Sequence, residues 1–253
     1  MERIVYEKNF LKNVIFRVDF LLDEKEFDNL MNKATLDEIK RRFEILEPLQ
    51  TIKNTNFMVD VNTNTINANQ NESKKYIFRK KQGNAALIID SQSIVIDYTK
   101  YLNAEMLLED IKLLNFIFAK ISISRIGLRY INYIEPTGFG EIDWDKYIHN
   151  SIRESQKIDF GGSLLQSINV TDIKYDDYII KFQSGIHNQN FPADRVKDAY
   201  VLDFDAFSNE IKPTEDIEKM IEKWNIQIGK LFEKFITPDF REILNGNSEL
   251  QYK

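Results

Sequence analysis

The chain has 253 residues, 43% of them hydrophobic and 12% aromatic, so it can bury a substantial core as one large domain or two smaller ones. The formal net charge of −6 disfavours a general binder of nucleic acid or anionic membrane, which usually carries a basic surface. The sequence contains no cysteine, which excludes disulfides, thiolate catalysis and cysteine-based metal centres.

The N-terminal stretch MERIVYEKNFLKN lacks the apolar core of a signal peptide. No apolar run in the chain approaches the roughly 20 residues that are needed to span a bilayer. Together with the absence of cysteine, these features predict a cytoplasmic protein that does not engage a membrane.

Residues 14–20 show a strong period of two, which predicts a β-strand with Val14, Phe16, Val18 and Phe20 on one face. The next element is predicted to be a helix, because Thr35 and Glu38 have the spacing of a capping box and apolar residues recur behind them. Pro48 is expected to stop this helix.

Four short strands are then predicted at 56–61, 75–81, 85–90 and 93–98. The Asn-rich stretch 62–74 between the first two is interpreted as an exposed hairpin loop. Residues 103–120 carry apolar side chains at helical spacing and predict a long helix.

The second part of the chain repeats this order of elements. It begins with a strand at 122–134 and a helix near 143–156, and continues with strands at 163–173, 178–186 and 198–207. A long helix is predicted from Pro213 to about Ile236, followed by a short one that is capped by Thr237 and ended by Gly246.

The predicted fold class is therefore α+β, with two β-α-β(3-4)-α halves. The N-terminal half covers 1–120 and the C-terminal half 121–253, and the two are expected to form one compact unit. In each half an antiparallel meander sheet is expected to pack on a long helix.

The strand 124-SRIGLRYINYIEP-136 places two arginines on one face. Since side chains alternate along a strand, Arg125, Gly127 and Arg129 share one side. Charged residues recur in the same way on other strands, notably Arg17, Asp203 and Asp205. These five charged residues, Arg17, Arg125, Arg129, Asp203 and Asp205, are the candidate ligand- or partner-binding residues.

Two interpretations of this charged face stay open. The favoured one is a solvated outer sheet face on which opposite charges pair across strands. The other is a binding surface, on which arginines with Cα atoms about 13 Å apart grip separated anionic groups. Gly127 either lets a ligand approach the backbone or marks a bulge.

The sequence offers no catalytic constellation. It has no phosphate-binding glycine loop, no dinucleotide-binding fingerprint and no nucleophile elbow. Its two histidines, His149 and His187, have no second histidine at metal-ligand spacing. We therefore expect no catalytic residue, no metal and no cofactor, although enzymatic activity is left open.

Four segments, 10-FLKNVIFRVDF-20, 124-SRIGLRYINYIEP-136, 200-YVLDFDAF-207 and 236-ITPDFREILNG-246, resemble a sporadically distributed family of uncharacterised prokaryotic proteins of similar length. The resemblance covers essentially the whole chain, and the stretch from Arg125 to Asn132 is its most specific part. The family has no assigned activity, so the resemblance implies no catalytic residue. Its scattered occurrence implies horizontally transferred modules, such as phage-defence or toxin–antitoxin loci.

Three hypotheses for function follow. The first is a non-enzymatic binding or interaction protein, an accessory or neutralising component of a prokaryotic defence or toxin–antitoxin type module, with a protein partner encoded nearby. The second is a binder of a small anionic molecule or nucleotide, hydrolytic in one version, that uses the arginine-lined sheet face. The third is an RNA-binding module, which the net charge disfavours.

Overall fold

The structure is a computed structural model that describes residues 6–60, 65–138, 140–211 and 216–251. In these residues the protein is a mixed α/β chain with a large antiparallel sheet and six α-helices. Within the same ranges, no helix combines the length and the apolar character that crossing a membrane requires.

The chain separates into two compact units. Unit 1 comprises residues 1–15, 99–104 and 127–253, and unit 2 comprises residues 16–98 and 105–126. The strands β1 (Leu11–Asp19) and β7 (Arg125–Ile134) contribute residues to both. Each unit is therefore assembled from segments that lie far apart in the sequence.

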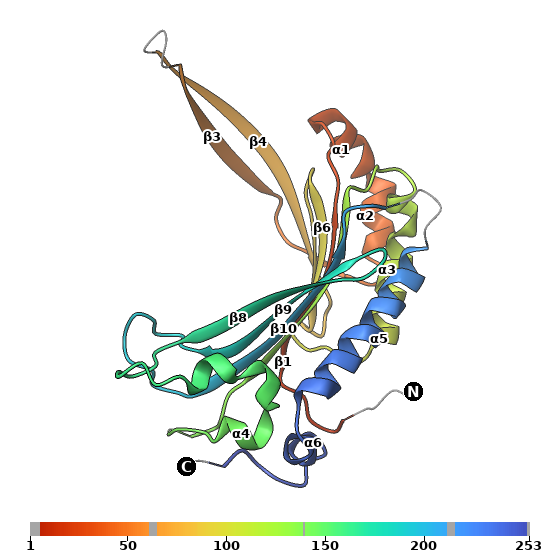
Figure 1. Ribbon diagram of the computed structural model, residues 1–253. Coiled ribbons are helices and arrows are strands. Elements are labelled where there is room, and N and C mark those ends of the chain that lie inside the picture. The colour runs from red at the N-terminus through yellow and green to blue at the C-terminus, as the bar shows by residue number, and fades with distance from the viewer. Residues whose placement is uncertain (1–5, 61–64, 139, 212–215, 252–253) are drawn as a thin grey trace. The chain divides into compact units, whose positions relative to one another are not determined.

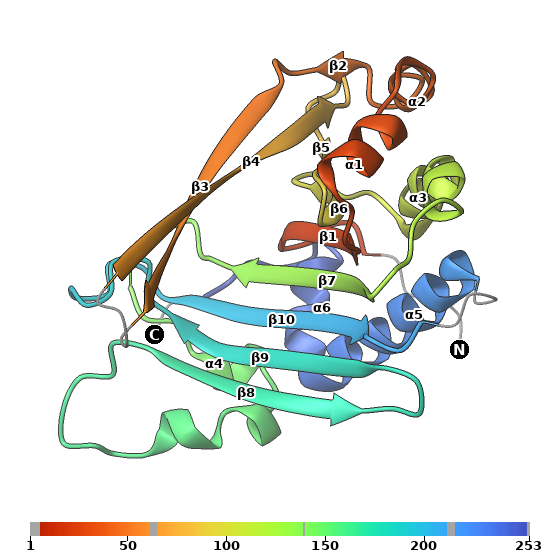
Figure 2. The same ribbon diagram turned by 90° about the horizontal axis from the view of Figure 1, so that it is seen from above.

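Unit 1 is built around four neighbouring strands in the order β7-β10-β9-β8 (Figure 2). Its further elements are α4 (Trp144–Tyr147), β8 (Ser167–Lys174), β9 (Ile179–His187), β10 (Ala199–Ser208), α5 (Ile217–Phe235) and α6 (Pro238–Leu244). The β8–β9 and β9–β10 pairs are antiparallel. The predicted strands at 178–186 and 198–207 are confirmed as β9 and β10.

Helix α5 lies beside β9 and β10 (Figure 1). The rings of Phe182 and Phe204 stack 4.8 Å apart, and Phe235 of α5 stacks on Phe182 at 4.6 Å. Aromatic rings bury a large apolar area and gain further from offset stacking. This contact explains why Phe182 and Phe204 face the helix while the alternate residues of their strands face the other way.

The single helix predicted near 143–156 is wrong. Only Trp144–Tyr147 is α-helical, and two short 3₁₀ turns follow at Asn150–Ile152 and Glu154–Lys157. The His149 side chain accepts a hydrogen bond from the Ser151 amide and so begins a new turn. At the other end of the unit, the predicted cap Thr237 and the terminating Gly246, with φ of 77°, are confirmed, whereas Pro213 and Thr214 lie outside the described residues.

Unit 2 places its strands in the order β2-β4-β5-β6-β1, with β3 paired to β4. Its elements besides β1 and β7 are α1 (Glu24–Leu30), α2 (Lys33–Ile39), β2 (Ile45–Leu46), β3 (Gln50–Asp60), β4 (Thr65–Arg79), β5 (Ala85–Ile89), β6 (Ser93–Tyr98) and α3 (Ala104–Phe118), of which Ala104 belongs to unit 1. The predicted alternation of β1 is confirmed, because Val14, Phe16, Val18 and Phe20 are all buried.

Two helices stand where the sequence predicted one. The capping box that was assigned to Thr35 and Glu38 is wrong, since Thr35 lies inside α2 and Asn32 caps that helix. The capping box that forms belongs to α1, where Asp23 and Glu26 bond each other's backbone amides. The capping box is therefore formed by the Asp–x–x–Glu spacing, and not by the Thr–x–x–Glu spacing that begins 12 residues later.

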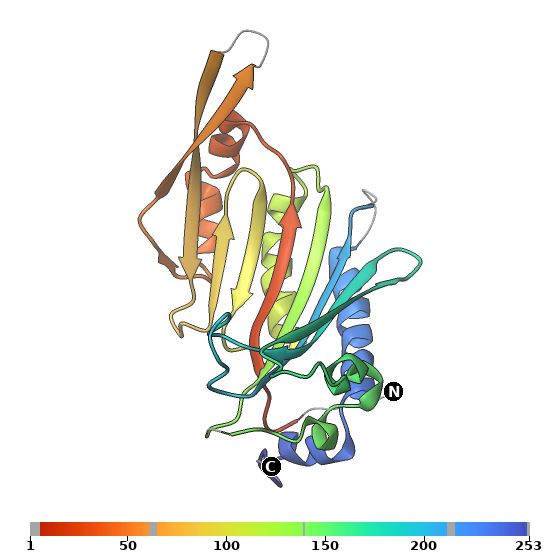
Figure 3. The same cartoon turned by 60° about the vertical axis from the view of Figure 1, so that its left-hand side comes forward.

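The Asn-rich stretch 62–74 is not the exposed loop that composition predicted. From Thr65 onward it belongs to β4, which pairs with β3 from Asp60 opposite Thr65 to Gln50 opposite Lys75. Residues 62–64 lie outside the described residues. The resulting two-stranded ribbon runs out beyond β5 and β6 (Figure 3). Pairing along a continuous antiparallel ladder has overridden the low strand propensity of asparagine.

A buried carboxylate organises the polar interior of unit 2. Asp110 of α3 has 0% exposure. It accepts hydrogen bonds from Arg42 Nε at 2.7 Å, Lys80 Nζ at 2.5 Å and Tyr98 Oη at 2.5 Å. These donors come from the turn after α2, the β4–β5 turn and the end of β6, so one acid ties three segments to the helix.

We expect Asp110→Ala to lower the free energy of unfolding by about 3–5 kcal/mol, because it leaves Lys80 and the Tyr98 hydroxyl buried without their acceptor. The measurement is urea denaturation followed by circular dichroism. As a control, Glu109→Gln removes an acid that is 64% exposed from the same Arg42, and should change stability by about 0–1 kcal/mol. Equal effects of the two substitutions would contradict the organising role of Asp110.

Candidate functional site

Strand β7 carries the two arginines that the sequence singled out. Its burial alternates as predicted, with Ile126, Leu128 and Tyr130 buried and the side chains of Arg125 and Arg129 28% and 39% exposed. Gly127 lies within the same strand at a buried position. The arginines thus face away from the apolar layer, and their partners decide what they can bind.

Arg129 is held by one acid in a two-point contact within unit 1. Its Nε donates to Asp203 Oδ1 at 2.9 Å and its Nη2 donates to Asp203 Oδ2 at 2.5 Å. Asp203 is only 5% exposed. The hydrogen bonds that Arg129 donates to Asp203, assisted by the charges of Asp203 and Asp205, raise the pKa of the Arg129 guanidinium above its usual value. Asp203 therefore occupies the fork of Arg129 that an anionic ligand would need.

Arg17 and Arg125 share a different acid, in unit 2. Arg17 Nε lies 2.6 Å from Asp19 Oδ1, and Arg125 Nη1 lies 3.5 Å from Asp19 Oδ2. The structure therefore brings Arg129 together with Asp203 and gathers the other two arginines around Asp19. Asp19 lies two residues after Arg17 on the same strand, and it was not among the candidate residues that the sequence singled out.

The remaining charges on this side of the sheet alternate in sign across the strands. Lys181 of β9 stands opposite Asp205 of β10 and, on its other side, opposite Asp172 of β8. Opposite charges in directly facing cross-strand positions attract each other. This arrangement is typical of neighbouring strands whose side chains balance one another's charge.

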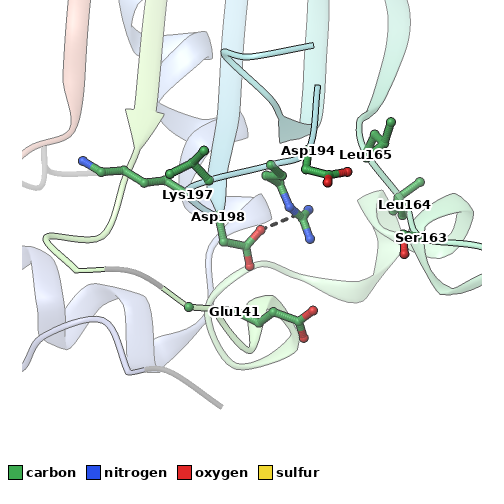
Figure 4. A pocket seen from close by; sticks show the side chains of 10 residues that line it. Glu141, Ser163, Leu164, Leu165, Asp194, Lys197 and Asp198 are labelled. Atoms are coloured by element: carbon green, nitrogen blue, oxygen red, sulfur yellow. Dashed lines mark ion pairs between the residues drawn. The ribbon is translucent and has the colours of Figure 1, made fainter. Parts of the chain in front are cut away.

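A second feature was not singled out from the sequence. A cavity of about 270 Å³ lies in unit 1, and we call it the loop cavity (Figure 4). It is lined by Gly140, Glu141, Ser163, Leu164, Leu165, Asp194, Arg195, Val196, Lys197 and Asp198. These residues come from the segments before α4 and before β8 and from the loop 188–198 between β9 and β10.

Hydrogen bonds of the buried Asn188 give the loop 188–198 a defined shape. Asn188 is 4% exposed, its Nδ2 donates to the Ala193 carbonyl at 2.7 Å, and its Oδ1 accepts from the Asn190 amide at 2.9 Å. Its own amide donates to Gln166 Oε1 at 3.3 Å, which ties the loop to the segment before β8. The loop is therefore held from within, and its outward-facing residues are presented in fixed positions.

A glycine permits the approach of the two segments that flank the loop cavity. Gly185 of β9 has φ of 150°, and a Cβ atom there would lie 1.8 Å from the Ser167 carbonyl oxygen. Only glycine fits so close a backbone contact. The approach sets the start of β8 against β9, and so places Ser163, Leu164 and Leu165 beside the loop.

Asp198 and Arg195 meet at the loop cavity. Asp198 is 5% exposed, and its Oδ2 accepts a hydrogen bond from the Ile142 amide at 2.8 Å. Its Oδ1 lies 3.1 Å from Arg195 Nη1, and the dashed line in Figure 4 marks this ion pair. The angle between the groups is poor, so in the described part of the chain neither of these two atoms makes a hydrogen bond.

The sequence contained a signal for this site that was not used. Residues 194–198 read Asp-Arg-Val-Lys-Asp, which places four charges in five residues directly before a buried strand. A charged residue at the entry of a buried strand must find a partner there, because burying an isolated charge is costly. That argument predicts the pairing of Asp198, but it does not predict the cavity, which depends on segments distant in sequence.

Across the described ranges, no group of three or more His, Asp and Glu side chains is placed to hold a metal ion. In comparisons with known proteins, no family model matches the chain and no curated protein matches it at a significant level. The interpretation of the site therefore rests on its geometry.

If the Arg129–Asp203 pair is structural, Asp203→Asn should lower the free energy of unfolding by about 1–2 kcal/mol, since Arg129 is partly exposed and screened by solvent. The control Glu38→Gln breaks a surface pair in which Arg41 is 72% exposed, and should cost less than about 0.5 kcal/mol. Both values come from urea denaturation.

The same pair predicts that phosphate and nucleotides leave the melting temperature of the wild type unchanged. A nucleotide-dependent rise that disappears in Arg129→Ala would contradict the structural role and would assign an anion site to this face.

Proposed function

We propose that this chain is a non-enzymatic binding protein that engages a protein partner through the rim of the loop cavity. The observation that carries the proposal is a loop, tied together by hydrogen bonds of Asn188, that leaves apolar side chains exposed to solvent. Phe191 and Val196 of the loop 188–198 are 59% and 57% exposed. Burial of these side chains by a partner surface would remove apolar area from water, which is favourable.

The neighbouring segment before β8 supports the same surface. Ile158 and Phe160 are 56% and 66% exposed, and they precede the cavity-lining residues Ser163 and Leu164 by only a few positions. Aromatic residues that are held in place lose little conformational freedom on binding and often supply much of the binding energy. The rim thus carries the aromatic and aliphatic side chains that a protein interface typically buries.

In its most concrete form, the proposal makes the chain an accessory or neutralising component of a prokaryotic defence or toxin–antitoxin type module. The gene for the partner lies nearby, and both proteins act in the cytoplasm. The resemblance to a sporadically distributed prokaryotic family, noted on the stretch from Arg125 to Asn132, motivates this setting. The alternatives of a nucleotide binder on the arginine face and of an RNA-binding module receive less support, because Arg129 is engaged by Asp203 and the charge is −6.

We also propose that the architecture derives from two like-ordered halves, 1–120 and 121–253. The element order supports this, because β1 and β7 each open a series of strands that a long helix, α3 or α5, follows. In this proposal each meander packs on its own long helix. The loop 188–198 then belongs to the second half alone, which suits a site that only one half needs.

The test is co-expression with the products of the neighbouring genes, followed by co-purification. We expect the wild type to retain one of them and Phe191→Ser to weaken the retained complex by about tenfold or more, the usual scale for an aromatic anchor. The control is Leu102→Ser, which removes another exposed apolar side chain, 77% exposed, outside the proposed surface.

A chain that is recovered alone under gentle conditions would contradict the proposal. A complex that survives Phe191→Ser as well as Leu102→Ser does would move the interface elsewhere on the chain.

A further inference from the structure

The end of β7 contacts the loop 188–198 at both of its ends. Gln189 Nε2 donates to the Tyr133 hydroxyl at 2.7 Å. Near the other end of the loop, Lys197 Nζ lies 3.0 Å from Glu135 Oε1, and Lys197 points away from the other side chains that Figure 4 labels. Tyr133 is the last residue but one of β7, and Glu135 follows that strand directly. One short stretch of chain therefore grips the loop where it begins and where it ends.

The Tyr133 side chain is held on several sides. Its ring meets the ring of His187 edge to face, with centroids 5.6 Å apart. The Lys12 ammonium lies 4.7 Å from the Tyr133 ring centroid, and the Tyr133 amide donates to the Phe10 carbonyl at 2.8 Å. Aromatic pairs and cations over a ring face each favour one orientation of the ring. The hydroxyl is thus a fixed acceptor for the amide group of Gln189.

A small residue lets the rings of Tyr133 and His187 meet. Strand β10 lies between β7 and β9, so the two rings reach each other across it. The residue opposite His187 in β10 is Ala199, which is 1% exposed. Residues that stand opposite each other share a face of the sheet, so a large side chain at position 199 would come between the rings. The three strands together therefore bring the Tyr133 hydroxyl to the start of the loop.

We propose that the end of β7 is a clamp that positions the loop 188–198 for its partner, with Tyr133 as the main positioning residue. Tyr133 acts through the loop, whereas Phe191 and Val196 supply the contacts. A loop that is already held in its binding shape loses less conformational freedom when a partner docks. This inference rests on the proposed function, since it names what sets the shape of the same surface.

The two contacts of the clamp are unequal. Lys197 and Glu135 are 40% and 32% exposed at their side chains, so solvent and salt screen their attraction. The contact of Tyr133 with Gln189 does not depend on charge. Burial raises the pKa of the Tyr133 hydroxyl above its usual value, so the hydroxyl stays neutral in ordinary buffers. Tyr133 should therefore hold the loop at any salt concentration, and Glu135 only at low salt.

The test is amide hydrogen exchange in the full chain, followed by NMR. Tyr133→Phe keeps the ring and removes the hydroxyl. Within the loop, the Asn190 amide donates to Asn188 Oδ1 and the Ala193 amide donates to the Asn190 carbonyl. We expect these two amides to exchange about threefold to tenfold faster in the variant, because one hydrogen bond that opposes local opening is lost. The amides of β9 and β10 should keep their rates.

The matched control is Tyr175→Phe. It removes a hydroxyl that also accepts a bond from a glutamine amide group, Gln227 Nε2 at 2.9 Å, but in the turn between β8 and β9. This control should leave the two loop amides unchanged. Glu135→Gln should speed their exchange by less than about threefold at about 0.02 M salt and have no effect at about 0.2 M.

A second measurement separates positioning from direct contact or general stability. In the co-purified complex, Tyr133→Phe should weaken binding by about threefold. The same substitution should have little further effect when it is combined with Phe191→Ser, because Tyr133 acts through the loop that carries Phe191. Effects that multiply in full would contradict a positioning role.

Unchanged exchange of Asn190 and Ala193 in Tyr133→Phe would overturn the inference. Equal acceleration by Tyr175→Phe, or acceleration spread equally over β9 and β10, would overturn it too. Such a failure is distinct from a failure of the proposed function. A partner that is released by Phe191→Ser keeps the interface even if the clamp is wrong, whereas a chain without a partner removes the function and leaves the exchange rates to decide whether the clamp holds the loop.

Discussion

The candidate site depends on the buried carboxylate of Asp198. A carboxylate that is 5% exposed is stable only if hydrogen bonds and opposite charge offset its lost hydration. The Ile142 amide and Arg195 supply these two contributions. Because Asp198 immediately precedes β10, its contacts fix the end of the loop 188–198 to the sheet on one side and to the segment before α4 on the other. The loop cavity exists because those segments are held at this point.

The two charged regions of unit 1 differ in how completely their charges and hydrogen bonds are matched by partners within the chain. On the sheet face, Arg129 is paired with Asp203 at two points and Lys181 stands between acids on both neighbouring strands. At the loop cavity, Asp194 and Glu141 are exposed, and Asp198 meets Arg195 as an ion pair without a hydrogen bond. Capacity for binding lies where a molecule leaves charge and hydrogen bonds unmatched, which favours the cavity.

Much of the architecture follows from sequence periodicity. The alternation of β1 and β7 and the helical spacing of α3 and α5 were predictable, because the spacing of apolar residues along a segment indicates which face is buried. The errors arise where tertiary contacts overrule local preference. Asn-rich residues enter β4 because β3 pairs with them, and the predicted helix at 143–156 breaks where His149 bonds to Ser151.

The candidate site was only partly predictable for a related reason. Side chains alternate between the two faces of a strand, and Arg129 and Asp203 lie on the same face of the sheet. Their pairing therefore follows once β7 and β10 are neighbours. The loop cavity is formed by segments near residues 141, 164 and 195, and no local pattern encodes their meeting. The close approach at Gly185 and the hydrogen bonds of Asn188 can be recognised only in the three-dimensional structure.

The most direct test of this account is hydrogen exchange at the Ile142 amide, which lies outside the named strands and helices and donates a hydrogen bond to Asp198 Oδ2. The account predicts exchange at least about a hundredfold slower than in an unstructured peptide, and loss of that protection in Asp198→Ala while the β9 and β10 amides stay protected. Exchange of Ile142 at the unstructured rate in the wild type would contradict the fixed loop and, with it, the preformed site.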